Sequence, residues 1–543
     1  MIKKILLGMM LISLFQISCN SKPSLSAKPK LVVVLVVDQM HPDLLTRFDA
    51  LYTGGFRWLI DHGTWFTNTH HEHGYTATGP GHFVIGSGRY PGPNGMMGNI
   101  FYDPILEKKV NCVEDPNAKV IENTGDARSY SRYTNTALSD WIKASDSLSK
   151  VYSIAGKDRS AVLMGGQKPD LAVYYNYDGQ FITSDYYTNK NPKWLTNFNT
   201  NLDIASFKDS LWTRSLDTSL YLTYARPDFF DGEVDEYLTD PYSPTFPIGI
   251  DSSKEAKTYF MGRPWFERSI LDLANVLVQA ESLGQDEHSD LLFIGFSAMD
   301  WMIHDYGPFS QEIMDAMIKL DGYLGNFINR LDQEIGLENI QFILTADHGG
   351  LPLPEYLQEQ GIEAGRYNKE EIEEAKEWIE DEIEERYGKD LFTRSGLQYF
   401  LNDENIKKAE VNPDSIVAIM KKYLLKIDGI AQVFTPNDVI NGDQNNPIIS
   451  RYMNMLHPIM SPDVFSIPEK NWVYRTFRGT SHGAPYDYDT HVPLLFSHEN
   501  NACQENDTKI ETVDIAPTIA KILNVAYPDL IDGKPILIDF KLD

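Results

Sequence analysis

The residues from 30 to 37 read KLVVVLVV and lead directly into Asp38. A continuous aliphatic run of this kind is typical of a strand covered on both faces, because a strand with one wet face would alternate apolar and polar residues. Strands buried in this way belong to parallel sheets, whose crossover connections are usually helices. The run therefore predicts an α/β fold with this strand near the centre of the sheet.

Three later segments have the same hydrophobic character, namely 291–296, 340–346 and 491–496. The first is followed closely by Asp300 and the second directly by Asp347. In open α/β sheets, ligands bind at the carboxyl ends of the strands. We therefore expect Asp38, Asp300 and Asp347 to lie at one edge of the sheet.

Helical patterns separate these strands. Apolar residues at three- and four-residue spacing predict a helix from Ser310, as its N-cap, to Leu331, packed on the sheet. The acidic stretch 370–386 has the same spacing and predicts a solvated amphipathic helix. Together these patterns predict a doubly wound, mostly parallel central sheet with helices on both faces and inserted subdomains.

The segment 351–472 interrupts the series of strands and is interpreted as an insertion. The predicted organisation is a signal peptide at 1–19, a linker at 20–29, an α/β catalytic core with insertions at 30–350, an inserted subdomain at 351–472 and the C-terminal part of the core at 473–543.

The N-terminus predicts export. A short basic start precedes an apolar stretch, 5–17, that is too short to span a bilayer comfortably, and a polar tract follows. This layout is typical of a bacterial signal peptide, so we expect a periplasmic or secreted protein. Cys19 allows a lipid anchor, but Gln16 stands where a lipobox usually has leucine. Lipoprotein and free secretion both remain open.

Composition argues against general nucleic-acid binding and against a cysteine metal site. With 48 basic and 77 acidic residues the formal charge is −29, so general nucleic-acid binding is not expected. An acidic protein can still bind a small anion through metal ions or a local Lys/Arg pair. After export, Cys112 and Cys503 remain, too few for a cysteine metal site. They allow a disulfide, but the sequence does not show whether they are close.

Histidines accompany the predicted edge carboxylates. Asp300 and His304 are four residues apart and would share one side of a helix. His348 follows Asp347, and His482 lies in a turn of small residues, GTSHG. With Asp38 this makes three carboxylates and three imidazoles. Such a set suits two zinc-like divalent ions bound by nitrogen and oxygen.

The segment 75–82, YTATGPGH, contains a candidate nucleophile, Thr78. Glycines let the backbone approach a ligand closely, and a following helix would direct N–H groups at an anion. A threonine hydroxyl is a poor nucleophile unless a base or a metal activates it. Two metal ions would activate the hydroxyl and stabilise the leaving oxygen. Helix capping is the alternative role for Thr78.

Together these motifs resemble the alkaline phosphatase superfamily, most of all its exported phosphate-irrepressible (PafA-type) alkaline phosphatases. The matching motifs run from Asp38 to VDIAPTIAKIL at 513–523 and Asp532. The resemblance implies that Thr78, placed before Gly81-His82, is the nucleophile. The zinc sites it implies are Asp38, Asp347, His348 and Thr78 for one ion, and Asp300, His304 and His482 for the other. His491 is a competing ligand, and His82 is expected to have a structural role.

The resemblance also implies which residues bind the phosphoryl group. Asn99 corresponds to an amide donor to a phosphoryl oxygen, and Lys157 and Arg159 correspond to the Lys-x-Arg pair of the PafA type. A Lys and an Arg two residues apart at a strand end can point to the same side. They would contact the oxygens of a dianionic monoester, the arginine in a fork and the lysine as a point charge.

The expected protein is an exported two-zinc phosphomonoesterase that acts on small-molecule phosphate monoesters through a phospho-threonine. A phosphodiesterase or nucleotide pyrophosphatase of the same superfamily is the alternative, and Lys157 and Arg159 discriminate because a diester carries one charge fewer. An exported binding or scaffold protein with structural zinc is a further alternative, which the nucleophile disfavours. The formylglycine of sulfatases has no precursor sequence here.

Overall fold

The structure is a computed structural model that describes residues 28–234, 245–249 and 256–538. The predicted signal peptide and Cys19 lie outside the described residues. Within the described ranges, no helix combines the length and the apolarity needed to cross a membrane. Cys112 is buried, Cys503 is exposed, and both carry free thiols.

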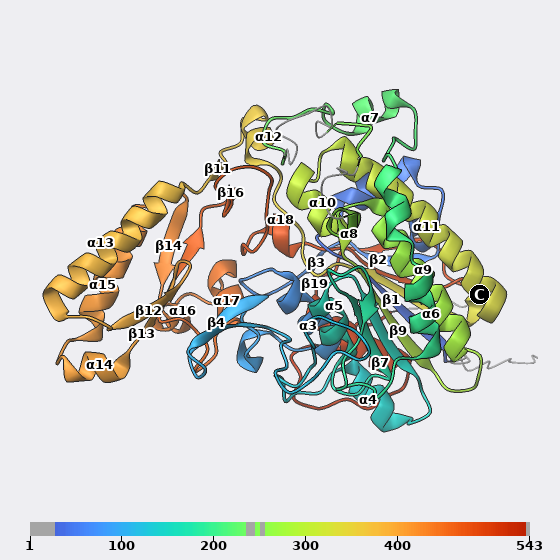
Figure 1. Cartoon of the computed structure of the whole chain (residues 1–543), viewed down its shortest axis with the longest axis horizontal. Coiled ribbons are helices and arrows are strands. Elements are labelled where there is room, and N and C mark those ends of the chain that lie inside the picture. The colour runs from blue at the N-terminus through green and yellow to red at the C-terminus, as the bar shows by residue number, and fades with distance from the viewer. Residues whose placement is uncertain (1–27, 235–244, 250–255, 539–543) are drawn as a thin grey trace, which may run out of the picture.

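A nine-stranded sheet forms the centre of the described part of the chain (Figure 1). Its strands are β1 (Leu31–Val37), β2 (Gly63–Phe66), β6 (Val151–Ala155), β7 (Leu171–Tyr175), β8 (Phe181–Ile182), β9 (Asp290–Phe296), β10 (Ile340–Thr345), β17 (Leu494–Ser497) and β18 (Gln504–Asn506). Their order is β18-β2-β17-β10-β1-β9-β6-β7-β8. Strands β10, β1, β9, β6 and β7 run parallel, which confirms the predicted α/β class. The strand predicted at 491–496 begins later, at Leu494, and pairs antiparallel with β10.

Strand β1 lies at the middle of this sheet and is fully buried. Its side chains alternate between two hydrophobic clusters, so that Val33 and Leu35 pack on one face while Val32 and Val34 pack on the other. Both faces are therefore dry, and each buried aliphatic side chain contributes roughly 1.5–3 kcal/mol of transfer free energy. This explains why β1 contains no polar residue.

Helices cover both faces of the sheet. The cluster on one face includes residues of α2 (Gly55–Asp61), α9 (Pro264–Glu281), α10 (Ala298–Tyr306) and α11 (Gln311–Ile335). The cluster on the other face includes residues of α3 (Thr78–Ser87), α4 (Leu138–Ser145), α5 (Asp158–Gly165) and α19 (Ile515–Ile522). The helix predicted from Ser310 is α11, which continues to Ile335. The Ser310 hydroxyl caps it by accepting the Ile313 N–H at 3.1 Å.

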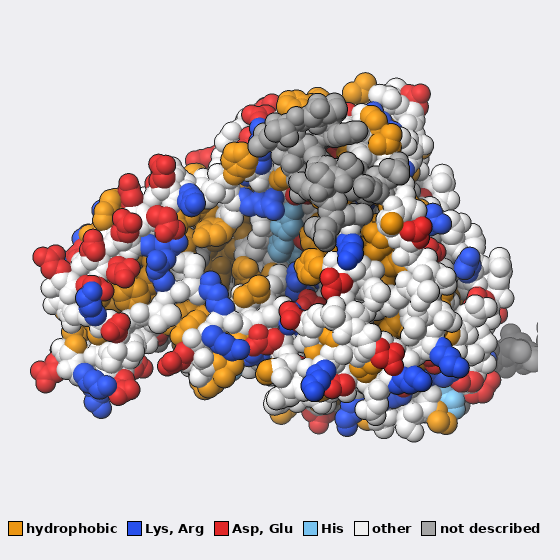
Figure 2. All heavy atoms as spheres, viewed as in Figure 1, with side chains coloured by type: hydrophobic (Ala, Val, Ile, Leu, Met, Phe, Trp, Pro, Cys, Tyr) orange, Lys and Arg blue, Asp and Glu red, His pale blue; other side chains and the backbone are white. Residues whose placement is uncertain are grey.

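The segment 351–472 builds a second region that extends away from the central sheet (Figure 1). It contains a four-stranded sheet in the order β12 (Phe392–Ser395), β13 (Gln398–Leu401), β15 (Val464–Pro468) and β14 (Ile430–Phe434). Its main helices are α13 (Lys369–Tyr387) and α15 (Pro413–Leu424), which share a separate hydrophobic cluster. Helix α13 is the predicted amphipathic helix, and acidic side chains lie on the outer surface of this region (Figure 2). The exact domain boundaries stay a prediction.

Shorter elements complete the fold. The helices are α1 (Asp43–Arg47), α6 (Lys193–Asn201), α7 (Thr218–Tyr224), α8 (Ala256–Met261), α12 (Pro354–Glu359), α14 (Asp403–Lys408), α16 (Pro436–Ile440), α17 (Pro447–Met453) and α18 (Asp487–Thr490). The strands are β3 (Thr69–His70), β4 (Ile100–Asp103), β5 (Lys108–Asn111), β11 (Gly365–Arg366), β16 (Trp472–Val473) and β19 (Ile510–Glu511).

Candidate metal centre and nucleophile

The carboxyl ends of β1, β9 and β10 bring three aspartates into one buried site. Asp38 directly follows β1, Asp300 lies in the first turn of α10 after β9, and Asp347 follows β10. The Lys157 ammonium lies between two of them, with Nζ at 2.6 Å from Asp38 Oδ2 and 2.6 Å from Asp300 Oδ2. The sheet edge thus positions these side chains through its parallel register.

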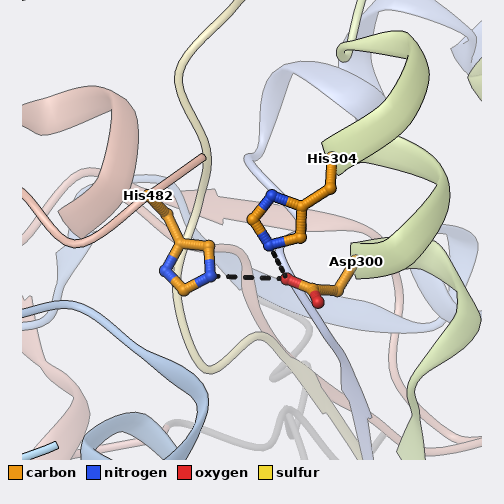
Figure 3. A group of neighbouring side chains, drawn as sticks. All are labelled: Asp300, His304 and His482. Carbon is orange, nitrogen blue, oxygen red and sulfur yellow. Dashed lines mark ion pairs between the residues drawn. The ribbon is translucent and has the colours of Figure 1, made fainter. Parts of the chain in front are cut away.

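Asp300, His304 and His482 form the first candidate metal group (Figure 3). Asp300 and His304 stand one turn apart on α10, and His482 approaches from the loop before α18. The Nε2 atoms of His304 and His482 lie 3.4 and 3.5 Å from Asp300 Oδ1. All three ligand atoms lie within 4.8 Å of one another, so one ion would reach them all.

Asp38, Asp300 and His348 form the second candidate group. His348 Nε2 lies 3.5 Å from Asp38 Oδ1 and also 3.5 Å from Asp347 Oδ2. Asp347 therefore stands beside this group. The spacing of ligand atoms places Asp300 between the two groups rather than in the first group alone.

Backbone carbonyls orient all three histidines. Nδ1 of His304 lies 2.7 Å from Thr480 O, Nδ1 of His348 lies 2.8 Å from Gly349 O, and Nδ1 of His482 lies 2.8 Å from Thr76 O. A carbonyl oxygen only accepts, so each Nδ1 carries the proton and each Nε2 presents a lone pair. A hydrogen bond from the ring nitrogen that does not face the ion is typical of histidines that bind metals.

The buried charges of the site also suit divalent ions. Asp38 Oδ1 and His348 Nε2 are buried without a hydrogen-bond partner. Burial and the neighbouring Asp347 carboxylate raise the pKa of Asp38 well above its usual range. Burial alone would also raise the pKa of Asp300, but the charge of Lys157 holds it well below that range. Buried carboxylates in excess over nearby cations are costly unless ions compensate them, so the residues fit two bound metal ions.

Thr78 lies at the first position of α3, and Ala77 is the N-cap. Helix capping by Thr78, the alternative prediction, is wrong because Ala77 occupies the N-cap position and Thr78 is the first helical residue. Its Oγ1 instead accepts a hydrogen bond from Lys157 Nζ at 3.3 Å. The side chain is fully buried beside the candidate metal groups.

Asn99 lies against the first turn of the same helix. Its Oδ1 accepts the backbone N–H of Gly79 at 2.6 Å. Because the amide oxygen is engaged in this way, the Nδ2 amide group is the end that can donate to a ligand. The contact joins Asn99 to the residue immediately after Thr78.

Lys157 and Arg159 occupy the start of α5 rather than a strand end. Lys157 is the N-cap and Arg159 lies in the first turn. The strand-end explanation for their common direction is therefore wrong, and of the two it is Lys157 that contacts Thr78, Asp38 and Asp300. Burial alone would lower the pKa of Arg159, but the carboxylates of Asp158, Asp38 and Asp300 raise it. The guanidinium itself pairs with Asp158, with Nη1 at 3.6 Å from Oδ1.

His491 and His82 have other partners. His491 stacks on His70 with ring centroids 4.7 Å apart, and its Nε2 lies 2.8 Å from Thr67 O. The structure thus places it outside both ligand groups, and His482 is the better candidate. His82 Nδ1 lies 2.8 Å from Thr78 O and 3.2 Å from Asp347 Oδ2, so this buried histidine joins the nucleophile helix to the metal loop.

Glu267 of α9 supports α10, a role that no sequence pattern indicated. Its Oε1 accepts the Met299 N–H at 3.0 Å, at the helix start just before Asp300. An isolated glutamate within an amphipathic helix carries no local sequence signal for such a long-range contact. The contact depends on how α9 packs against α10.

Replacing Glu267 with alanine is expected to lower the free energy of unfolding by about 1–3 kcal/mol, because buried N–H groups lose their acceptor. Burial raises the pKa of Glu267 from 4.5 to about 8. The folded state therefore holds this proton more tightly than the unfolded state. The resulting stabilisation is complete below about pH 4.5 and disappears as pH rises through about 8.

Urea unfolding at pH 5 and pH 9 measures this effect. Glu267→Gln keeps an acceptor and cannot ionise, so it should gain stability relative to the parent as the pH rises. Equal pH dependence in the parent and Glu267→Gln would show that Glu267 does not titrate in this way.

The fold and the site define an enzyme of the alkaline phosphatase superfamily, with a central α/β sheet and metal-ligand groups at its carboxyl edge. The family model for type I phosphodiesterase / nucleotide pyrophosphatase matches residues 32–488. The chain belongs to this family.

Similar proteins support this assignment. Alkaline phosphatase PafA of Elizabethkingia meningoseptica is 29% identical over 98% of each chain. Alkaline phosphatase PhoV of Synechococcus elongatus is 31% identical and covers 95% of this chain and 93% of its own. A crystal structure of PafA superposes with a TM-score of 0.87 at 28% identity, covering 94% of this chain and 98% of that one.

Proposed function

We propose that this chain is an exported phosphomonoesterase that uses two zinc ions and forms a phospho-threonine at Thr78. The observation that carries the proposal is the position of Lys157, whose Nζ lies 3.3 Å from Thr78 Oγ1 and bridges Asp38 and Asp300. One cation thus lies beside both the candidate nucleophile and the candidate metal groups. The names of the relatives PafA and PhoV, both alkaline phosphatases, support the same activity.

The proposed ligands are Asp38, Asp347, His348 and Thr78 for one ion, and Asp300, His304 and His482 for the other. When bound, the ions supply Lewis-acid stabilisation of the oxygens that gain charge during phosphoryl transfer. Imidazole and carboxylate ligands without thiolate are compatible with zinc at both positions.

In the proposed reaction, Thr78 Oγ forms a bond to phosphorus while the bond from phosphorus to the ester oxygen breaks. The threonine proton passes to solvent, and the departing oxygen takes a proton from solvent to become an alcohol. Water then attacks the phosphorus of the phospho-threonine, which releases inorganic phosphate and restores the Thr78 hydroxyl. The carboxylates of Asp300 and Asp38 raise the pKa of Lys157 although its burial opposes this. A charged ammonium next to Oγ stabilises the negative charge of the deprotonated threonine.

The second anionic charge of a monoester distinguishes it from a diester. Lys157 and Arg159 offer an ammonium and a guanidinium, and the Asn99 amide offers a further donor for a phosphoryl oxygen. Positioned donors of this kind stabilise the charge that develops on the transferred group. The alternative, a phosphodiesterase, is favoured by the description of the family model that matches this chain.

Removing both side chains, with Lys157→Ala and Arg159→Ala, is expected to lower monoester kcat/KM by roughly a hundredfold or more, and diester hydrolysis much less. The physical reason is the loss of two charge-assisted hydrogen bonds that a diester needs less. Rates on phenyl phosphate and on its methyl ester measure the difference.

The matched control is Arg128→Ala. Arg128 Nε pairs with Asp158 at 2.8 Å, so this variant removes another arginine from the same aspartate that Arg159 approaches. It should affect both substrates alike. Equal losses on monoester and diester in the double variant would favour the diesterase and leave the Lys/Arg pair a structural role.

A further inference from the structure

A cavity of about 430 Å³ opens between the central α/β region and the segment 351–472. Tyr75 and Ile100 line it from the central region, Tyr452 and Trp472 line it from the second region, and His482 lies at its wall. Figure 2 shows hydrophobic side chains gathered in a hollow between the two regions, with histidine visible beside it. The volume lies within the range of small-molecule binding sites, about 300–1,000 Å³.

Tyr75 is held in this cavity by two glycines. A Cβ atom on Gly98 would lie 3.1 Å from Tyr75 Cε1, and one on Gly483 would lie 3.1 Å from Tyr75 Cε2. Gly483 also has φ of +114°, which disfavours any larger residue. Both positions thus leave room for the two edges of the ring, which remains 40% exposed.

The two glycines connect Tyr75 to the site. Gly98 immediately precedes Asn99, and Gly483 immediately follows His482. The ring therefore lies between the loop of the proposed phosphoryl donor and the loop of a proposed metal ligand. Tyr75 itself lies three residues before Thr78.

The cavity lies on the leaving-group side of the proposed reaction. Asp300 Oδ2 faces Lys157, the partner of Thr78, whereas Asp300 Oδ1 faces His482 at 3.5 Å. In-line transfer places the departing oxygen opposite the attacking one. The leaving-group path assigned here runs along the Oδ1 side of Asp300 toward His482 and the cavity that His482 lines.

The lining selects for a flat and uncharged group. Aromatic rings stack offset or edge to face, and a fixed ring costs little entropy when it binds another. Lys109 is the one lysine or arginine among the described lining residues. The Asp489 carboxylate is engaged, because its Oδ2 accepts the N–H groups of Gly483 and Ala484 at 2.8 and 2.7 Å.

We propose that this cavity binds the leaving group of the substrate, that this group is a flat, uncharged aromatic, and that Tyr75 determines the preference by stacking on it. This inference rests on the proposed function, since it names the substrate class of the same site. Nucleosides and simple aryl alcohols share the required chemistry, and the experiment separates them.

The test compares 1-naphthyl phosphate, adenosine 5′-monophosphate and glycerol 3-phosphate as substrates of the parent and of Tyr75→Ala. For each substrate the variant-to-parent ratio of kcat/KM cancels the intrinsic reactivity of the ester. The loss on 1-naphthyl phosphate should exceed the loss on glycerol 3-phosphate by about tenfold, whereas Tyr75→Phe should keep the preference. A large loss on the nucleotide extends the class to nucleosides, and a small one limits it to aryl groups.

Two further variants keep the test interpretable. Tyr75→Leu retains an apolar side chain without the ring, so it should lose the preference even if the alanine variant unfolds. Tyr177→Ala removes an exposed tyrosine in the β7–β8 turn, away from the cavity lining, and should leave all three ratios near one. Equal losses on aromatic and alkyl esters would overturn the proposal.

Direct binding separates this inference from the proposed function. 1-Naphthylphosphonate resists hydrolysis, and calorimetry measures its Kd for the parent, Tyr75→Ala and Tyr75→Leu. Weaker binding to both variants by about tenfold supports the cavity even if the parent hydrolyses no monoester. Unchanged Kd values would overturn the role of Tyr75 whatever the activity.

Discussion

Replacing Thr78 with valine is expected to lower kcat/KM for a phosphate monoester by about 10⁴-fold or more, the scale seen when a covalent nucleophile is removed. Valine keeps the branched shape of threonine but has no hydroxyl. Thr78 is fully buried at the start of α3, and its Oγ1 contacts Lys157. The fold should therefore persist while the acceptor of the phosphoryl group is lost.

Acid quenching during turnover of a ³²P-labelled monoester measures the covalent step. The parent should yield labelled Thr78, and Thr78→Val should yield none. Thr78→Ser is the matched control, because it retains a hydroxyl at the same position and should form a labelled serine. Label on any other residue of the valine variant would assign the nucleophile elsewhere.

Removing the metal ions with a strong chelator is expected to reduce turnover by at least about a hundredfold, and added zinc should restore it. The thermal midpoint should also fall, because Asp38, Asp300 and Asp347 are buried and would lose their compensating charge. A bound zinc ion stabilises the folded state by about 4 kcal/mol when free zinc is a thousandfold above its Kd, and this is the free energy of unfolding that removal of one ion should cost.

Elemental analysis of the purified protein should find two ions per chain. His482→Ala should lose one of them, since His482 belongs to the group with Asp300 and His304. His491→Ala is the matched control, because His491 stacks on His70 outside both groups and should retain both ions. Full activity in protein shown to be free of metal would refute the two-ion proposal.

Local patterns predicted several elements correctly. The aliphatic run became β1, the stripe after Ser310 became α11, and the acidic stretch became α13. Each prediction succeeded because the periodicity of a strand or helix reflects the faces that it buries. The antiparallel direction of β17 was not predictable in this way, since the apolar pattern of a buried strand is the same in both directions.

Some features of the candidate site were visible in the sequence, and others depend on the tertiary structure. The acidic residues at strand ends and the His-Gly turn were visible in the chain, and the resemblance then implied their grouping. The position of Asp300 between two ligand groups depends on distances across three strands and a helix. The start of α5 at Asp158, directly after Lys157, likewise depends on where β6 ends and on how its loop packs.

By itself the sequence determined the α/β class, the central strand and the residue types at the carboxyl edge of the sheet. These properties follow from local hydrophobic periodicity and from the chemistry of single side chains. Only the tertiary structure decided that Lys157 contacts Thr78, that carbonyls orient the three histidines, and that Tyr75 is held between Gly98 and Gly483. The physical reason is that such contacts join residues far apart in the chain, and their distances are set by packing of whole elements.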